Sequence, residues 1–292
     1  MRADPEAYEC VAPDSLQEVV TLLAAEPGAW VPLAGGTDVM VLYAAGKLTA
    51  RKFVSIWNLP ELRRIVVLPD EIMMGAACTY SSLRQHGLLE REFAMLAAAA
   101  SWTGGIANQN RGTLGGNIAN ASPAADSLPA LLAYDAELIL ASVRGDRRIP
   151  YQGFHQGYKK TAMAPDELIR AVCLPRKFSG YSSYTRKVGA RSSQAIAKVC
   201  VAALGKCAHG VIEDVRVAFG SVAPVPLRLV KLEAALKGKE IGGELRDMAR
   251  KLVAAEIAPI TDIRSNVEYR VAVAQNLMAE FLEQLASSAS RA

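Results

Sequence analysis

Residues 103–122 have the sequence Thr103-Gly-Gly-Ile-Ala-Asn-Gln-Asn-Arg-Gly-Thr-Leu-Gly-Gly-Asn-Ile-Ala-Asn-Ala-Ser122. Five glycines and four asparagines in twenty residues favour turns and positive φ, so we predict an irregular loop here rather than a regular helix. The Ala-rich apolar segment 92–102 before it is predicted to be a buried helix. A new helix is predicted after it, with Ser122 as N-cap, Pro123 at the first helical position and apolar residues up to Leu132.

A second glycine pair, Gly35-Gly36, lies about eighty residues before the pair Gly115-Gly116 and directly follows a predicted strand over 30–33. Glycine lets backbone N–H groups approach an anion closely, and successive N–H groups in a turn form an anion-binding nest. Thr37 and Thr113 stand beside the two pairs and offer hydroxyl donors. Two such loops predict that the pyrophosphate of a dinucleotide cofactor is held from both sides.

Common alternatives to this cofactor site lack their motifs. The glycines do not form G-x-G-x-x-G, and G-x-x-x-x-G-K-[ST] is absent, which disfavours a Rossmann site and a P-loop. G-x-S-x-G is absent as well, which disfavours a serine hydrolase. Asp126 lies near the start of the predicted helix, where its carboxylate could accept hydrogen bonds from ribose or flavin groups.

Outside these loops the chain shows an α+β pattern. The first helix is predicted from a capping box, with Ser15 as the cap and Glu18 reaching back. The polar stretch 176–183 after Leu174-Pro175 predicts a boundary between two domains, 1–176 and 177–292. Strands are predicted at 53–56, 72–74, 136–142, 195–204 and 211–219, the last two joined by a turn at His209-Gly210, and helices at 226–237, 243–256 and 266–286.

Composition limits the classes of protein to which the chain can belong. The 292 residues carry a net charge of +4 with acids and bases interspersed, and a nucleic-acid binder would more often show a dense basic stripe. The five cysteines form no C-x-x-C pair and the three histidines stand apart from them, which argues against a zinc or iron–sulfur site. The start shows no secretory signal and no window is apolar enough for a membrane span, so we expect a cytoplasmic protein.

Several ordered motifs together resemble one family. They are Ala34-Gly-Gly-Thr-Asp38, Pro60-Glu-Leu-Arg63, Gly112-Thr-Leu-Gly-Gly-Asn117, Ala121-Ser-Pro-Ala-Ala-Asp126, Tyr158-Lys-Lys-Thr161, Asp166-Glu-Leu-Ile169, Lys187-Val-Gly-Ala-Arg191 with Ile196-Ala-Lys198, and Ser265-Asn-Val-Glu-Tyr-Arg270. This set is similar to the FAD-binding (medium) subunit of the xanthine dehydrogenase and carbon monoxide dehydrogenase family of molybdenum hydroxylases. The resemblance extends over nearly the whole chain.

The resemblance implies a fold and a set of cofactor-binding residues. The fold would be α+β, with an FAD-binding domain of two α/β subdomains (PCMH-type) followed by a smaller C-terminal domain of a sheet with helices. The residues expected to bind FAD are Pro32, Leu33, Ala34, Gly35, Gly36, Thr37, Asp38, Val39, Thr103, Gly112, Thr113, Leu114, Gly115, Gly116, Asn117, Asp126, Ile169 and Lys187. We expect no catalytic residue and no metal ligand on this chain.

The sequence also departs from the family at two places. Asn108-Gln109-Asn110 stands where relatives often have Ile-Arg-Asn, so that the arginine is shifted to Arg111. Thr103 stands where relatives place a bulky apolar residue near the flavin ring. We expect these changes to affect ring stacking and the local redox environment rather than cofactor binding.

The function implied by the resemblance is that of an oxidoreductase subunit that transfers electrons. It would pass electrons from [2Fe-2S] clusters of a small partner subunit to an external acceptor, while a large molybdopterin-type subunit hydroxylates the substrate; the whole would be a dimer of heterotrimers. One alternative is a stand-alone FAD-dependent oxidase or reductase, which would need its own substrate pocket and general base. Another is a nucleotide-binding or scaffold module without enzymatic activity.

Overall fold

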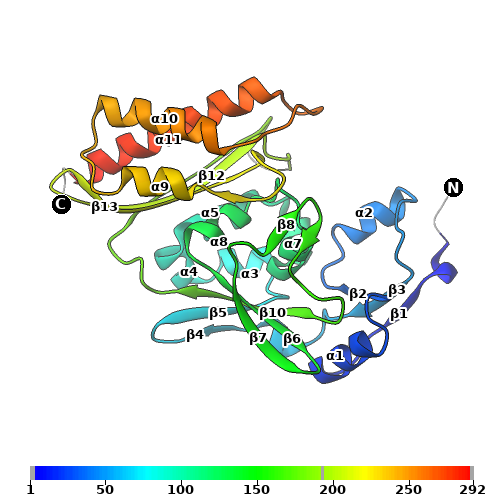
Figure 1. The fold of residues 1–292 in the computed structure, drawn as a ribbon. Helices are drawn as coiled ribbons and strands as arrows, with labels where there is room; N and C mark the ends of the chain where they lie inside the picture. The colour runs from blue at the N-terminus through cyan, green and yellow to red at the C-terminus, as the bar shows by residue number, and fades with distance from the viewer. Residues whose placement is uncertain (1–3, 192–193, 290–292) are drawn as a thin grey trace.

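The part of the chain that the computed structural model describes, residues 4–191 and 194–289, contains four sheets (Figure 1). A small parallel sheet lies at the N-terminal end, a five-stranded sheet at the centre and a four-stranded sheet at the C-terminal end. A short hairpin forms the fourth. The mixed helix and sheet content confirms the predicted α+β fold class.

The N-terminal sheet has the order β1-β3-β2, with all neighbours parallel. As predicted, helix α1 begins with a capping box, because the Ser15 hydroxyl accepts from the backbone N–H of Glu18 at 3.2 Å. Val19 and Leu23 of α1 pack with Val54 in a small core. The elements are the 3-10 helix η1 (Pro5–Ala7), β1 (Glu9–Val11), α1 (Leu16–Ala25), β2 (Trp30–Leu33), α2 (Val39–Ala44) and β3 (Lys52–Ser55).

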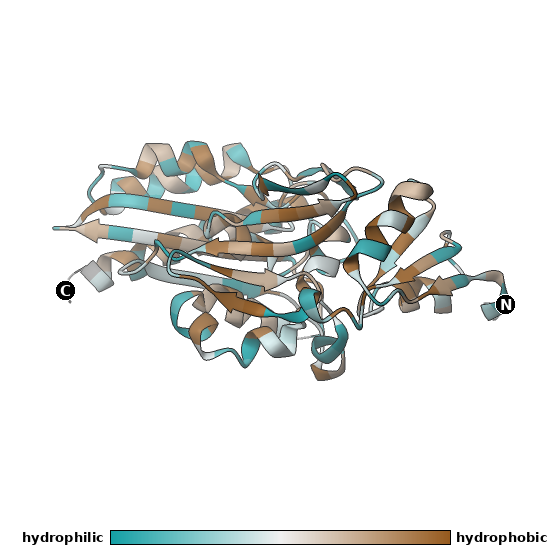
Figure 2. Ribbon diagram, turned by 90° about the horizontal axis from the view of Figure 1, so that it is seen from below, coloured by the Kyte–Doolittle hydropathy of each residue, from teal (hydrophilic) through white to brown (hydrophobic). Residues whose placement is uncertain are grey.

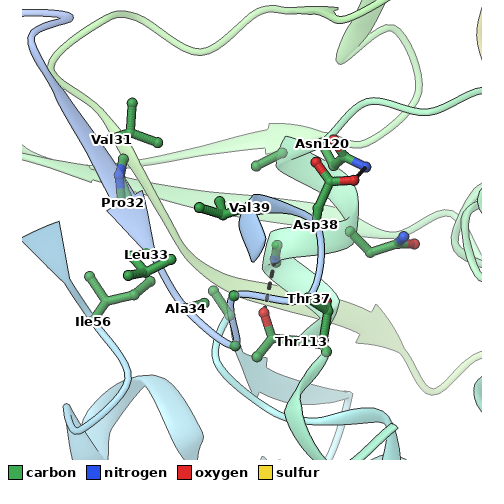
Figure 3. Close-up of a pocket in the computed structure, with 18 of the residues that line it drawn as sticks. Val31, Pro32, Leu33, Ala34, Thr37, Asp38, Val39, Ile56, Thr113 and Asn120 are labelled. Atoms are coloured by element: carbon green, nitrogen blue, oxygen red, sulfur yellow. Dashed lines mark hydrogen bonds between the residues drawn. The ribbon is translucent and has the colours of Figure 1, made fainter. Parts of the chain in front are cut away.

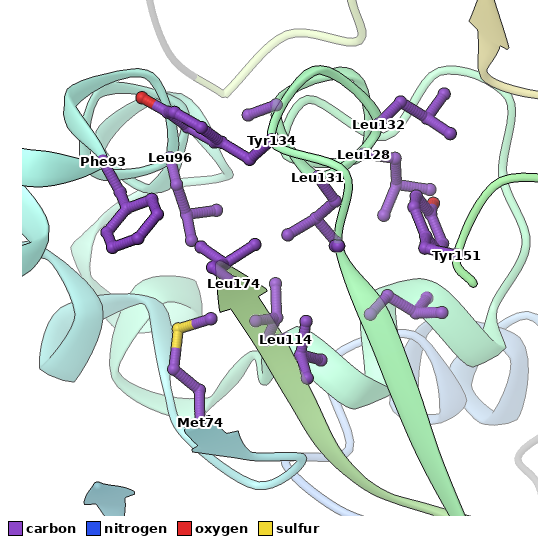
Figure 4. Packing of buried hydrophobic residues seen from close by; sticks show 14 of the residues in the cluster. Met74, Phe93, Leu96, Leu114, Leu128, Leu131, Leu132, Tyr134, Tyr151 and Leu174 are labelled. Atoms are coloured by element: carbon purple, nitrogen blue, oxygen red, sulfur yellow. The ribbon is translucent and has the colours of Figure 1, made fainter. Parts of the chain in front are cut away.

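The central sheet has the order β4-β5-β10-β6-β7 and is antiparallel throughout. Helices gather on one of its faces, and Figure 4 shows Leu114, Leu131 and Leu174 meeting in the core between them. The elements are η2 (Pro60–Arg63), β4 (Ile65–Val67), β5 (Glu71–Gly75), α3 (Tyr80–Arg84), α4 (Gly87–Glu92), α5 (Ala94–Trp102), α6 (Ile106–Arg111), α7 (Leu114–Ala119), α8 (Leu128–Ala133), β6 (Glu137–Ser142), β7 (Gly145–Pro150), β8 (His155–Gly157), β9 (Lys160–Thr161) and β10 (Leu168–Pro175).

Two local predictions for this region were wrong. The segment 103–122 is not one irregular loop, because it contains the short helices α6 and α7, with Gly112 ending the first and Thr113 capping the second. The following helix does not start at Ser122 and Pro123 but at Leu128, after Ser127. Pro123 lies in a turn whose carbonyl accepts a hydrogen bond from the N–H of Ser221 at 2.8 Å, so a tertiary contact outweighs the local helix signal.

The C-terminal sheet has the order β11-β12-β13-β14 and is antiparallel. As predicted, the two long strands β12 and β13 are joined by a tight turn, in which His209 and Gly210 both have positive φ. The elements are β11 (Ser182–Val188), β12 (Val199–Ala208), β13 (Val211–Gly220), β14 (Leu227–Arg228), α9 (Val230–Leu236), α10 (Gly243–Glu256) and α11 (Val267–Ala289).

These parts stack in layers (Figure 1). Helices α9, α10 and α11 cover the outer face of the C-terminal sheet, and α5 and α8 lie between that sheet and the central one. In Figure 2 many strand residues are brown, whereas the outer helices alternate between brown and teal, as expected for helices buried on one side. Within the described ranges, no helix has both the length and the apolar character needed to cross a bilayer.

Candidate cofactor site

A cavity of about 630 Å³ lies between the N-terminal sheet and the helices of the central unit. This volume is within the usual range for small-molecule and cofactor sites. Figure 3 shows Val31, Pro32 and Leu33 of β2 on one side. The loop after β2 crosses to the α7 region, where Thr37 lies beside Thr113 and Asp38 beside Asn120. The two glycine loops, far apart in sequence, therefore share one cavity.

The first loop, Gly35 to Asp38, lines this cavity and has free backbone donors. None of the four N–H groups has a hydrogen-bond acceptor within residues 4–191 and 194–289. Gly36 has φ +76°, a conformation that side chains with a Cβ rarely adopt. A Cβ atom on Gly35 would lie 1.6 Å from the carbonyl oxygen of Arg111, so this glycine is required where the two loops touch. The loop has the properties of an anion-binding nest.

The second loop, which contains Gly115-Gly116, does not offer the free backbone donors that the sequence predicts. The N–H of Leu114 donates to the carbonyl of Cys78 at 3.0 Å, and the N–H of Gly115 donates to the carbonyl of Ala76 at 2.9 Å. The N–H of Gly116 is capped by the Thr113 hydroxyl at 3.1 Å, a contact drawn in Figure 3. These three donors are therefore already occupied, and the loop contributes shape and side chains more than free N–H groups.

A buried hydrogen-bond network supports the floor of the cavity. The hydroxyls of Tyr80 and Ser127 lie 3.0 Å apart, and the Ser127 hydroxyl donates to the Asn117 side-chain oxygen at 2.9 Å. Tyr80 and Asn117 both line the cavity, whereas Ser127 is completely buried behind them. Burial raises the pKa of the Tyr80 phenol well above its usual range, so this hydroxyl stays protonated.

An ion pair links the two sides of the predicted domain boundary. Lys187 of β11 donates to Asp126 Oδ2 at 2.6 Å and to the carbonyl oxygen of Trp102 at 3.1 Å. Both side chains are almost fully buried. Burial raises the pKa of the Asp126 carboxyl to about 6, while the charge of Lys187 acts in the opposite direction. Trp102 precedes Thr103, so the pair lies next to the Thr103 end of the cavity.

One oxygen of this pair has no partner in the described chain. Asp126 Oδ1 is buried and accepts no hydrogen bond from residues 4–191 or 194–289. A buried carboxylate oxygen without a donor is costly. The residues therefore fit a cofactor that brings an N–H or O–H group to this place, together with an anionic group at the first loop.

The structure brings most of the predicted site residues together. Those that line the cavity are Pro32, Leu33, Ala34, Gly35, Gly36, Thr37, Asp38, Val39, Thr103, Gly112, Thr113, Gly115, Gly116, Asn117 and Ile169. Leu114 does not line it, because its side chain is fully buried in the core. Asp126 and Lys187 also lie outside the lining, as the adjacent ion pair.

Other lining residues were missed by the sequence analysis. Asn108 and Asn120 belong to the Asn-rich segment already singled out, so their type was a usable signal. Leu48, Ala50 and Met163 carry no such signal, because apolar residues at a cavity look like any other core residues in sequence.

Comparisons with known proteins agree with this geometry. Residues 6–177 match the model of the family described as the FAD binding domain in molybdopterin dehydrogenase, and residues 184–285 match the CO dehydrogenase flavoprotein C-terminal domain. The xanthine dehydrogenase FAD-binding subunit of Escherichia coli O157:H7 is 31% identical over 279 residues, which cover 94% of each chain.

Two further relatives cover nearly all of the chain. The glyceraldehyde dehydrogenase medium chain of Sulfolobus acidocaldarius is 29% identical, with 97% of this chain and 99% of the relative covered. Among solved structures, a carbon monoxide dehydrogenase from Hydrogenophaga pseudoflava superimposes with a TM-score of 0.90 at 27% identity, covering 95% of this chain and 96% of the other.

Proposed function

This chain belongs to the family of FAD-binding subunits of molybdopterin dehydrogenases, and from that membership we propose that it transfers electrons within a multi-subunit hydroxylase. Electrons would pass from iron–sulfur clusters of a small partner subunit to an external acceptor, and a large molybdopterin-type subunit would hydroxylate the substrate. The observation that carries the proposal is the row of four free N–H groups, Gly35 to Asp38, in a cavity of cofactor size.

The first loop is proposed to hold the FAD pyrophosphate. Its four residues line the cavity, and their backbone N–H groups have no competing acceptor in the described chain. The second loop is proposed to close the other side of the same group through Thr113, Gly116 and Asn117, all of which line the cavity. Of the other residues expected from the family motifs, those that line the cavity are proposed as further contacts. Leu114 is not, because its side chain is buried in the core and its N–H is occupied.

The ion pair of Asp126 and Lys187 is proposed to serve the flavin end. Asp126 Oδ1 can accept a hydrogen bond from the cofactor, and Lys187 places a positive charge close by. Bound FAD supplies reversible storage and exchange of electrons, and the protein tunes its potential through such hydrogen bonds and charges. Thr103 is proposed to leave this end of the cavity more polar than in relatives with an apolar residue there.

We also propose how the chain is organised and assembled. The boundary between an FAD-binding domain (1–176) and a C-terminal domain (177–292) is supported by the change of sheet between β10 and β11. A dimer of heterotrimers is supported by the general preference of assemblies for twofold symmetry. A cytoplasmic location is supported by five free cysteines, which are typical of a reducing compartment.

The alternative, a stand-alone oxidase or reductase, is not favoured. It would need a general base facing its own substrate, and within residues 4–191 and 194–289 no histidine, cysteine or glutamate lines the cavity. Asp38 lines it but points toward the amide of Asn120 (Figure 3).

The test is to identify the bound cofactor and the way it is held. We expect one FAD per chain, bound without a covalent link, because no described histidine or cysteine lines the cavity. After acid precipitation, the flavin should remain in the supernatant and should be FAD. Flavin in the pellet would contradict non-covalent binding, and FMN in the supernatant would contradict the pyrophosphate site.

A further inference from the structure

Three side chains from three segments meet beside the cavity, just beyond the first loop. The Asn120 amide nitrogen donates to Asp38 Oδ1 at 3.4 Å, and the Lys159 ammonium donates to the Asn120 amide oxygen. Figure 3 shows the side chains of Asp38 and Asn120 pointing toward each other. Asp38 is the last residue of the first loop, and Asn120 directly follows α7, which starts at the second loop.

Lys159 is placed there by the β8–β9 hairpin. The base of this hairpin is fixed to α7, because the His155 Nε2–H donates to the carbonyl oxygen of Ile118 at 2.9 Å. Lys159 lies at the turn with φ +58°, a left-handed conformation that few non-glycine residues adopt. The fold therefore holds Lys159, at the tip of the hairpin, next to Asn120, whose side chain also contacts Asp38 of the first loop.

The charges at this place do not balance. Lys159 is exposed and forms no ion pair with an acid of the described chain; its hydrogen-bond acceptor is a neutral amide. Within residues 4–191 and 194–289, Arg111 is the other cation that hydrogen-bonds to a residue lining the cavity; it donates to the carbonyl of Gly35 at 3.3 Å and stacks on Trp57. Asp38 adds a negative charge next to the loop where a pyrophosphate is proposed.

A dianion beside a carboxylate is repelled unless a cation lies nearby, and neutral N–H groups offset this repulsion only in part. Lysine suits this role because its ammonium is a compact charge on a flexible stem. Lys159 contacts Asn120 from outside the cavity, so rotation of its stem can carry the ammonium toward Asp38 and the first loop.

We propose that Lys159 is a further cofactor-binding residue, which supplies the countercharge for the FAD pyrophosphate, and that the β8–β9 hairpin is a strap that retains the cofactor. This role rests on the proposed function, because it requires FAD in the cavity. Asn120 is then the positioning residue that keeps the ammonium near the loops when the cofactor is absent.

The test compares Lys159→Met with Lys160→Met in the full chain. Lys160 is the adjacent exposed lysine of the same hairpin and has no hydrogen bond to the cavity lining. Methionine keeps the length of the stem and experiences the same backbone strain at φ +58° as lysine. FAD affinity and release rate are measured by the recovery of flavin fluorescence, with thermal unfolding recorded to check the fold.

We expect Lys159→Met to weaken FAD binding about tenfold or more, the value of one charge-assisted hydrogen bond, with faster release. Lys160→Met should match the wild type, and Lys159→Arg should recover most of the affinity. ADP carries the pyrophosphate without the flavin. Its affinity should therefore fall in Lys159→Met in parallel with that of FAD.

The outcomes separate this inference from the proposed function. Equal FAD affinity and release for the wild type, Lys159→Met and Lys160→Met would overturn the role of Lys159 and leave the FAD site in place. An unchanged ADP affinity in Lys159→Met would overturn the pyrophosphate contact. A wild-type chain that binds no FAD would overturn the proposed function and this inference with it.

Discussion

A Cβ atom on Gly115 would lie 2.5 Å from the Cβ of Ala76, whereas one on Gly116 would meet only the Thr113 hydroxyl, at 2.8 Å. We therefore expect Gly115→Val to lower the free energy of unfolding by about 3 kcal/mol through overpacking. Gly116→Val should cost about 1 kcal/mol, through the lost cap, and should abolish FAD binding because its side chain projects at the cavity. Urea denaturation and fluorescence titration measure the two effects.

Both variants are needed because the two glycines have different roles. Gly115 is buried against Ala76, the residue after β5, so loss of FAD in its variant would not distinguish a damaged fold from a blocked site. Gly116 is exposed and lines the cavity. Full flavin occupancy in a folded Gly116→Val protein would show that this loop does not contact the cofactor.

Asp126 gives the protein a pH dependence of unusual sign. Its pKa is raised from 3.8 to about 6, so between about pH 4 and 6 the folded protein holds a proton that the unfolded chain has released. The contribution of this group to the free energy of unfolding therefore falls as pH rises through that window, by up to about 3 kcal/mol. Asp126→Asn should remove this component in urea denaturation across the window.

Asp166 provides a control with the opposite sign. The hydrogen bond from Arg144 lowers the pKa of its carboxyl, so its contribution to stability is present at neutral pH and is lost as pH falls through the lowered value. Asp166→Asn should therefore reduce the loss of stability at low pH. Parallel pH profiles for the wild type and Asp126→Asn would contradict the raised pKa of Asp126.

At the scale of elements, local signals predicted those parts of the fold whose cause is local. The capping box at Ser15, the turn at His209-Gly210 and the helix 243–256 were all recognisable because their hydrogen bonds lie within a few residues. The start of α8 was not, because the carbonyl of Pro123 is engaged by Ser221 from the C-terminal part. Glycine content also concealed α6 and α7.

The same distinction applies to the site. The glycine loops were visible in sequence, and the structure places both at one cavity. The occupation of the Gly115 N–H by Ala76 and the meeting of Lys159 with Asn120 depend on segments that are distant in sequence, so composition and spacing could not reveal them. Lys187 was found only through the family motif, since an isolated lysine gives no sign of burial.

Helices α3 and α6 are linked by a hydrogen bond between the side chains of Arg84 and Gln109. Gln109 is 1% exposed, accepts from the Arg84 guanidinium at 2.5 Å and donates to the carbonyl of Ser101 at 2.9 Å. Gln109→Arg would place a guanidinium at a buried position next to that of the exposed Arg84, and we expect a loss of about 3 kcal/mol in the free energy of unfolding.

Adding Arg84→Gln to this variant tests whether the loss of stability comes from the two neighbouring guanidinium groups. The double variant exchanges the two residue types, so the new glutamine can again accept from the new arginine, and we expect it to recover more than half of the lost stability. A double-mutant cycle by urea denaturation gives this coupling energy directly. Additive effects of the two substitutions would show that the two side chains do not depend on each other.

At the scale of the whole molecule, the cavity and the domain boundary are parts of one arrangement. β11 of the C-terminal sheet carries Lys187 to Asp126 and to the carbonyl of Trp102, the residue before Thr103. The C-terminal part therefore contributes a charge to the end of the cavity that the FAD-binding part encloses. The two relatives compared are matched over 94% and 99% of their own length, so the match includes both parts.

The chain alone should show no substrate-dependent hydroxylase activity and should gain it only with its partners. The cavity lining of the described chain offers backbone donors, hydroxyls and amides that hold a cofactor, and its titratable side chains are Asp38, which faces Asn120, and Tyr80, whose raised pKa keeps it protonated. A flavin that receives electrons from a partner must lie near a subunit interface, and obligate interfaces typically bury more than about 2,000 Å².

Dye reduction by candidate substrates is measured with this chain alone and then with the large and small subunits co-expressed. Addition of Lys187→Met to the co-expressed complex serves as a matched variant, because it should slow dye reduction while substrate binding to the large subunit is unchanged. Robust turnover by the isolated chain would contradict electron transfer as its role and would favour the stand-alone oxidase.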